Sequence, residues 1–204
     1  MKFILGTKVN MTEYFSEKGE VFPVTIVSAG PITVTRVFEK DKDGYNAVQV
    51  GFGTQKESRI TKARKGTMKG GLFRTLKEFR LKGDNTSSLK EGDIVDVSAF
   101  VAGDVIRVTS VSKGKGFQGG VKRHGFHGGP RTHGQKHSER EPGSIGGGLR
   151  THVPKGMRMA GRMGGDRITQ KNLKVVLVDQ ENNMMLVKGA IAGKRGSLVE
   201  IIGQ

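Results

Sequence analysis

The sequence predicts a mainly β protein, an antiparallel β-barrel with one short helix and a long irregular extension. Three observations favour this fold. About eight short runs rich in β-branched residues are separated by turn signals at irregular spacing. Only residues 72–80 have the apolar spacing of a helix. Residues 113–172 hold 16 of the 32 glycines and have no regular apolar spacing, so this stretch lacks the means to build a core of its own.

The first strands are predicted within residues 1–54. Residues 24–28, 32–38 and 45–52 are rich in valine, isoleucine and threonine, which suit a pleated and half-buried surface. A glycine and a proline separate the first two runs, and the sequence Lys-Asp-Gly at 42–44 predicts a hairpin turn before the third.

The predicted helix covers residues 72–80. Leu72, Leu76 and Phe79 recur on one side, and basic residues fall on another, which is also the pattern of an ordinary solvated face. The strand pattern then resumes in five runs, at residues 94–100, 104–111, 173–179, 184–188 and 197–202. We expect the last strands to pair with the first ones and so to complete the barrel.

The extension is predicted to be an insertion between two strands of the barrel. Residues 1–112 and 173–204 would form a single discontinuous barrel domain, and residues 113–172 would form the inserted loop. Loops longer than about 15 residues without structure of their own are usually functional or disordered. An insertion differs from a tail because it leaves the domain and returns to it at fixed points.

The charge of the chain predicts a polyanionic partner. The net charge is +16 and the isoelectric point is about 10.3, which favours nucleic acid over an anionic membrane. Residues 113–172 alone carry 13 lysines and arginines against three acids. A flexible and strongly positive segment of this kind needs a polyanion to become ordered.

The composition also excludes several kinds of site. The chain has no cysteine, which rules out disulfides, thiolate zinc sites and a cysteine nucleophile, and suits a reducing cytoplasm. The N-terminal residues do not resemble a signal peptide, and no apolar run is long enough to span a bilayer. We therefore expect a cytoplasmic protein without a membrane partner.

Two motifs suggest chemistry, and each has a better explanation. Residues 114–119 match G-x-G-x-x-G, but no helix pattern follows, so close approach of the backbone to phosphates is the better interpretation than a dinucleotide site. The five histidines lie in a stretch with no scaffold to fix metal ligands, so contacts with RNA are favoured over a metal site. No set of nucleophile, base and acid is evident. The sequence thus predicts neither an enzyme, nor a cofactor, nor a small-molecule substrate.

The candidate RNA-binding residues are aromatic residues, cations and histidines. Phe117 and Phe126 are the aromatic residues of the extension, and each is either a stacking platform for a base or a local hydrophobic pin. No recognition helix or other groove-reading motif is evident, which favours RNA recognised by shape and backbone over sequence-specific DNA. The remaining candidates are cations and histidines, namely Lys56, Arg59, Lys62, Arg64, Lys65 and Lys69 before the predicted helix, Lys113, Lys115, Lys122, Arg123, His124, Arg131, Lys136, Arg140, Arg150, His152, Lys155, Arg158, Arg162, Arg167 and Lys171 in the extension, and Lys194 and Arg195 in a late turn.

The chain resembles the universal L3 family of large-subunit ribosomal proteins, of the bacterial type. The runs FVAGDVIRVTSVSKGKGFQGGVKR, GSIGGGLRTHVPKGMRMAGRMGGDRIT and NNMMLVKGAIAGKRGSLVEI look like signatures of that family, and ILGTKVNMTEYFSEKGEVFPVTIV and DGYNAVQVGFG also fit. The resemblance covers essentially the whole chain in order. It implies a barrel of the translation-protein type on the outer side of the large subunit, with an extension running through large-subunit RNA toward the peptidyl transferase centre.

The resemblance also implies roles and partners. Members of the family bind large-subunit RNA early, help to nucleate assembly, and contact neighbouring ribosomal proteins. Two features depart from the family pattern: Arg107 stands where an acid is usual, and residues 147–149 lack the glutamine that some bacterial members methylate, so we expect no such modification. The residues expected by resemblance to contact RNA at the start, tip and return of the extension are Lys113, Lys115, Lys122, Arg123, Arg150, Lys155, Arg158 and Arg162.

Three functions compete at this stage. The leading hypothesis is a structural constituent of the large ribosomal subunit that supports its assembly, with no catalytic group of its own. The first alternative is a free RNA-binding or RNA-chaperone protein outside the ribosome. The second, an RNA-modifying enzyme with a barrel domain, is disfavoured by the missing cofactor motif and by the lack of plausible catalytic groups.

Overall fold

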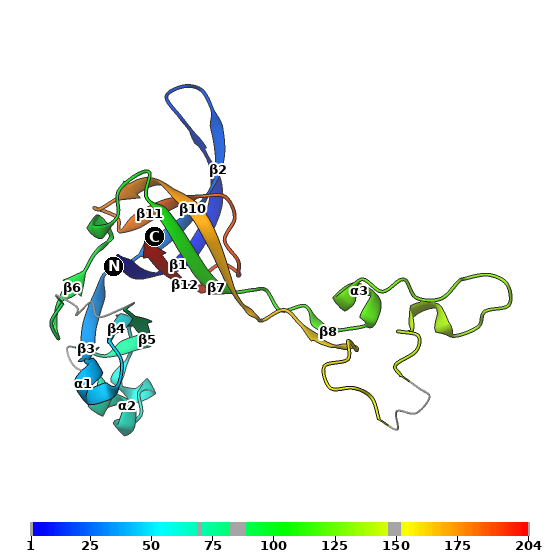
Figure 1. The fold of residues 1–204 in the computed structure, drawn as a ribbon. Coiled ribbons are helices and arrows are strands. Elements are labelled where there is room, and N and C mark those ends of the chain that lie inside the picture. The colour runs from blue at the N-terminus through cyan, green and yellow to red at the C-terminus, as the bar shows by residue number, and fades with distance from the viewer. Residues whose placement is uncertain (1, 69–70, 82–88, 147–151, 204) are drawn as a thin grey trace. The chain divides into compact units, whose positions relative to one another are not determined.

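The computed structural model describes residues 2–68, 71–81, 89–146 and 152–203 (Figure 1). By its internal contacts the chain divides into two compact units. One unit consists of residues 1–111 and 167–204, and the other of residues 112–166. The first unit contains two sheets, and the second is the irregular part of the chain.

Six strands of the first unit form a closed antiparallel barrel, which confirms the predicted fold class. Each strand pairs with its neighbours in antiparallel register, and β12 pairs with β1, as expected for the last and first strands. Closure leaves no exposed sheet edge within the barrel. In their order around the barrel the strands are β1 (Phe3–Phe15), β12 (Leu198–Gly203), β7 (Val105–Val111), β10 (Arg167–Asp179), β11 (Met184–Lys188) and β2 (Val21–Ala29).

The barrel interior is filled by aliphatic side chains. Ile4 and Leu5 of β1, Met185 of β11 and Ile201 of β12 are fully buried. Because side chains alternate between the two faces of a strand, one set of residues on each strand faces inward and forms this core. Thr25 is the main polar exception, and its hydroxyl donates a 2.6 Å hydrogen bond to the carbonyl of Gly189.

A second sheet packs in the same unit. Its strands follow the order β5 (Phe73–Arg80), β4 (Ala47–Thr54), β3 (Ile32–Phe38) and β6 (Ile94–Val95). Phe79 of β5 stacks on Phe3 of the barrel strand β1, with ring centroids 4.6 Å apart. The two sheets therefore share one hydrophobic core.

The helix predicted at residues 72–80 is wrong, because this segment is the strand β5. Leu76 pairs with Gly51 of β4, and the ring of Phe73 lies where a side chain at Gly51 would otherwise be. Short apolar runs fit both helical and strand spacing, and here pairing with β4 decides between them. The helices that the structure does describe are short ones elsewhere, namely α1 (Lys40–Asp43), α2 (Lys62–Thr67) and α3 (Gly120–His124), with 3-10 turns η1 (Glu57–Arg59), η2 (Val97–Ala99) and η3 (Ser138–Arg140).

Three other boundaries differ from the prediction. The run at residues 94–100 is a strand only at β6 and then turns into η2, which buries Val97 and Phe100. Strand β1 lies in the region of residues 1–54 where strands were predicted, but no individual run was predicted for it, and the side chains of its outer half are mostly exposed. Strand β10 begins at Arg167, so residues 167–172 are not irregular but pair with β7 as part of the barrel.

An ion-pair junction joins the second sheet to the barrel. Glu200 of β12 accepts hydrogen bonds from Lys77 of β5 at 2.8 Å and from Arg167 of β10 at 2.5 Å. Burial raises the pKa of Glu200, but the hydrogen bonds and charges of Lys77 and Arg167 outweigh this effect, so its pKa lies below the ordinary value. The junction therefore stabilises the folded state when Glu200 is ionised.

We expect Glu200→Gln to lower the free energy of unfolding by about 1–3 kcal/mol near neutral pH, because it leaves two cations facing each other without their acid. A lowered pKa stabilises the folded protein above the unfolded pKa of about 4.3, and this contribution is lost as the pH falls through the folded value. Urea titrations from pH 3 to 7 should therefore show the two proteins converging at acid pH. Glu181→Gln, at an exposed turn, is the matched control, and an equal loss in that variant would contradict the role of the junction.

Candidate nucleic-acid interface

A two-stranded ribbon forms part of the second unit. Strands β8 (Gly116–Gln118) and β9 (Gly161–Met163) are antiparallel, and the N–H of Lys115 donates to the carbonyl of Met163 at 2.9 Å. Next to the ribbon, Gly164 has a φ of +74°, and a side chain there would clash with the carbonyl of Lys113. The glycine allows two backbones to approach closely while the side chains of Lys113, Lys115 and Arg162 remain exposed.

The short helix α3 follows β8 directly. Its residue Arg123 donates from Nη1 to the carbonyl of Met159 at 2.8 Å, and Nε2 of His124 lies 3.0 Å from the same oxygen. These contacts join two limbs of the extension that are separated by more than 30 residues. Arg123 thus holds the backbone in shape, whereas Lys122 on the same helix is exposed.

The two aromatic candidates have different surroundings. Phe117 is 76% exposed, as a stacking platform for a base would be. Phe126 packs on Gly120, where an added Cβ would lie 2.7 Å from its ring, and the Arg158 guanidinium lies 5.6 Å from the ring centroid. Phe126 therefore fits the alternative interpretation, a local hydrophobic pin.

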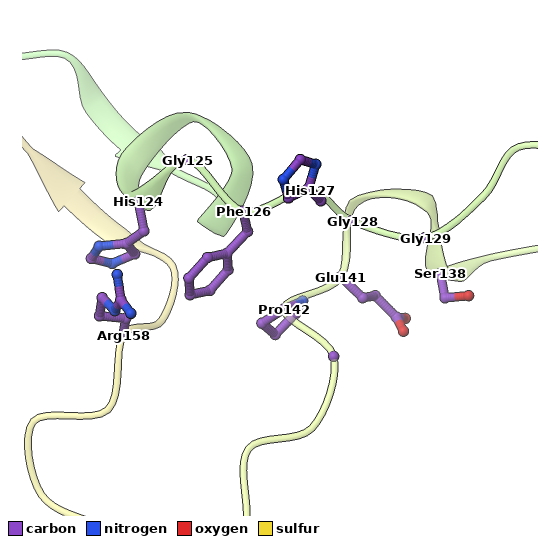
Figure 2. A pocket seen from close by; sticks show the side chains of 11 residues that line it. His124, Gly125, Phe126, His127, Gly128, Gly129, Ser138, Glu141, Pro142 and Arg158 are labelled. Atoms are coloured by element: carbon purple, nitrogen blue, oxygen red, sulfur yellow. The ribbon is translucent and has the colours of Figure 1, made fainter.

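A hollow of about 520 Å³ lies beside Phe126. Figure 2 shows His124, Phe126 and Arg158 on one side of the view, and Glu141 extending away from them on the side of Ser138. Glycine backbone at 125, 128, 129 and 143 forms much of the remaining lining. The hollow is large enough for one nucleobase, and its lining offers an aromatic ring, a guanidinium group and exposed backbone.

The 3-10 turn η3 is held by a close backbone contact. The N–H of Gly129 donates to the carbonyl of Glu139 at 3.0 Å, and the Glu139 carboxylate accepts a 2.6 Å hydrogen bond from Nε of Arg131. The Glu139 charge is thereby compensated within the extension. Arg140 on the same turn is exposed, as is Lys136 just before it.

Most of the positive charge on the described residues of the second unit is not in ion pairs. Among the described residues 112–146 and 152–166, Arg131 and Glu139 form the one ion pair. Exposed lysine and arginine side chains can bind the phosphate oxygens of RNA. The predicted cations and histidine of this unit that are exposed are Lys113, Lys115, Lys122, Arg131, Lys136, Arg140, His152, Lys155, Arg158 and Arg162.

The candidates of the first unit form several separate groups. Lys56, Arg59, Lys62, Arg64 and Lys65 gather around η1 and α2, where Lys65 pairs with Glu57 and Arg64 reaches the carbonyl of Arg74 at 3.4 Å. On β10, Arg167 belongs to the Glu200 junction, while Lys171 is exposed. In the late turn, Arg195 donates to the Asn10 side chain at 2.6 Å, and Lys194 is exposed. The predicted residues Lys69 and Arg150, and residues 147–149, lie outside the described residues.

Two further observations concern metals and membranes. Across the described residues, no three His, Asp or Glu side chains lie close enough together to hold a metal ion. No helix in the described ranges is long and apolar enough to cross a membrane.

Comparisons with known proteins identify the family. A model of the family "Ribosomal protein L3" matches residues 68–185, which include the whole second unit. The chain belongs to the ribosomal protein L3 family. A large ribosomal subunit protein uL3 from Herpetosiphon aurantiacus is 50% identical over 97% of this chain and 94% of its own length. The corresponding protein of Roseiflexus sp. is 49% identical over 97% and 95%, and that of Finegoldia magna is 42% identical over 98% and 97%.

Membership of the L3 family confirms the resemblance seen in the sequence. The relatives match over nearly their full lengths, so the similarity extends to the barrel, the second sheet and the extension alike. Their names describe ribosomal proteins and not enzymes. The family does not by itself assign a role to any side chain, and the RNA-binding roles of individual residues stay predictions.

Proposed function

We propose that this L3-family chain is a structural constituent of the large ribosomal subunit and binds large-subunit RNA through its extension. The observation that carries the proposal is the combination of exposed cations and closely packed glycine backbone in residues 112–166. Cations such as Lys115, Lys122 and Lys155 neutralise phosphates, and contact with phosphates releases condensed counterions. Glycines such as Gly164 let two limbs of the extension pack closely against each other.

The proposal extends to assembly and to the place of the extension in the subunit. An extension of this composition acquires its shape by packing among folded RNA helices, so it brings RNA segments together as it becomes ordered. We propose that this supports early subunit assembly and that the extension reaches toward the peptidyl transferase centre. We propose that its role there is to brace RNA, without supplying a group that acts as acid or base.

The remaining parts of the proposal concern partners and place in the cell. The partners are large-subunit ribosomal RNA and neighbouring large-subunit ribosomal proteins, and the protein acts in the ribosome, in the cytoplasm. The predicted division, one discontinuous barrel domain of residues 1–112 and 173–204 with the loop of residues 113–172 inserted in it, is proposed with the return point moved to Arg167, where β10 begins. We propose no cofactor, metal or small-molecule substrate.

Sedimentation distinguishes this function from a free RNA chaperone. We expect the full-length protein, expressed in a bacterial cell, to sediment with the large subunit and to stay bound through washing at moderate salt. Many phosphate contacts made at once give slow dissociation even when each contact is weak. Recovery of the protein only in the soluble pool, at any salt concentration, would favour the chaperone function.

Hydrogen exchange supplies a second test. In the free protein we expect slow exchange in the barrel strands and rapid exchange throughout residues 113–166, because the extension buries little apolar surface. In the assembled subunit the same amides are expected to be protected by RNA. Strong protection of the extension in the free protein would contradict the proposed dependence on RNA.

A further inference from the structure

We propose that the β1–β2 hairpin is a docking surface for a basic protein. The hairpin projects beyond the barrel, and Figure 1 shows it rising from the strands labelled β1 and β2. Pairing of β1 with β12 ends at Thr7, and pairing of β2 with β11 begins at Val24. Residues 9–23 therefore extend past the two strands that flank them in the barrel. The inference rests on the proposed function, since it takes the partner to be another protein of the large subunit.

One face of this hairpin is apolar and exposed. Phe15 pairs directly with Val21, and Met11 pairs with Thr25, so alternation places Met11 and Phe15 on the same face as Val21. Phe15 is 67% exposed, Val21 49% and Met11 41%. Glu13 and Pro23 form the pair that lies between them on the same face, so this face carries apolar side chains around one carboxylate. Exposed apolar side chains scattered singly need no explanation, but a group of them on a projecting hairpin marks an interaction surface.

The opposite face is partly covered by the chain itself. Tyr14 and Phe22 pair across the hairpin on that face, and both are half-buried. The ammonium group of Lys188 lies 3.8 Å from the centroid of the Phe22 ring. The hairpin thus has one face partly covered by Lys188 of its own barrel and one face whose apolar side chains are substantially exposed.

The charge of the hairpin indicates which class of partner would bind it. The hairpin carries Glu13, Glu17 and Glu20 against the single cation Lys18, in a chain whose net charge is +16. All three carboxylates are exposed. Phosphates of RNA and anionic lipid surfaces would be repelled here, whereas a protein rich in lysine and arginine would be attracted. The partner that fits an acidic, apolar strip is therefore a basic protein.

The turn at the tip of the hairpin is held by its own hydrogen bonds. The N–H of Ser16 donates to the carbonyl of Glu20 at 2.9 Å, and the N–H of Glu20 donates to the Ser16 hydroxyl at 3.0 Å. Gly19 takes a φ of +80° in this turn. A turn fixed by its own hydrogen bonds loses little conformational entropy on binding, unlike the extension.

Site-specific photo-crosslinking tests the inference. The full-length chain carries p-benzoylphenylalanine in place of Phe15, is assembled into large subunits in a bacterial cell, and is irradiated in the purified subunits. We expect an adduct with a second protein whose isoelectric point is above about 9. The same photo-reactive residue in place of Phe117 is the control, and there we expect an adduct with RNA.

The outcomes separate the inference from the proposed function. An RNA adduct at position 15, or no adduct there while position 117 reacts, overturns the docking surface but leaves RNA binding intact. A protein without excess positive charge as the partner also overturns it. Loss of the RNA adduct at position 117 would instead count against the proposed function.

Charge reversal supplies the second arm. Glu13→Lys, Glu17→Lys and Glu20→Lys together are expected to lower the yield of the position-15 protein adduct by about fivefold or more, because they remove the attraction to a basic partner. Glu39→Lys, Asp41→Lys and Glu181→Lys make the same charge change at exposed residues elsewhere and should leave the yield unchanged. Equal yields from the two triple variants would contradict the electrostatic part of the inference.

Discussion

Replacing Lys113, Lys115, Lys122 and Lys155 by glutamine is expected to weaken binding to large-subunit RNA by about a hundredfold at 0.15 M salt. All four side chains are exposed, and none has a hydrogen bond or ion pair within the described residues. Their loss therefore removes charge and leaves the contacts that shape the extension in place. The physical reason for the effect is the loss of counterion release at four phosphates.

The salt dependence is the more specific readout. Each phosphate contact contributes about 0.7 to 0.9 to the slope of log affinity against log salt concentration, so the slope should fall by about 3 units. Filter binding of the full-length chain to purified large-subunit RNA, at several salt concentrations, measures both quantities. The control is Lys18→Gln, Lys42→Gln, Lys90→Gln and Lys174→Gln, which lowers the net charge equally outside the extension. If both quadruple variants changed the slope to the same extent, binding would reflect overall charge and not the extension.

The fold could be predicted where local pattern and final pairing agree. Strands β2 and β7 are recognisable because their β-branched residues alternate or run continuously into the barrel core. Strand β5 could not be recognised, because the spacing of Leu76 and Phe79 satisfies a helix as well, and only the pairing with β4 removes the ambiguity. The outer half of β1 was not recognised as a run of its own, because its apolar residues are separated by polar ones and most of its side chains are exposed.

The candidate interface shows the same division. Composition alone identifies the extension as cationic and coreless, because charge and glycine content need no knowledge of the fold. It does not distinguish cations that hold the protein together from those that are free. Arg123 reaches Met159 and Arg167 reaches Glu200, each more than 30 residues away, and such partners leave no mark in the sequence around either arginine.

The second large effect concerns the shape of the extension and not its charge. Gly128 has a φ of +75°, and a Cβ there would lie 1.9 Å from the carbonyl oxygen of Glu139. Gly128→Ala must therefore break the backbone contact that joins this segment to η3, including the hydrogen bond from Gly129 to Glu139. We expect the variant to bind large-subunit RNA at least about tenfold more weakly, since the ordered form must be distorted before RNA fits it.

Gly134→Ala is the matched control. Gly134 has nearly the same φ, +77°, but nothing lies within 4 Å of the added Cβ. It isolates the strain of a left-handed backbone, about 1–2 kcal/mol for a residue with a side chain, from the clash at Gly128. We expect the smaller loss of affinity in this variant, and equal losses in the two variants would contradict a role for the backbone contact with Glu139.

The two classes of variant should differ in how their affinities depend on salt. Gly128→Ala keeps every cation, so its log affinity should fall by the same amount at each salt concentration and its slope should stay unchanged. The lysine variants should instead approach the original protein at high salt, where counterion release contributes less. If the extension bound RNA by charge alone, Gly128→Ala would bind as well as the original protein. If preformed shape alone mattered, removing four lysines would leave the slope of log affinity against log salt concentration intact. The two measurements therefore separate the contribution of charge from that of shape.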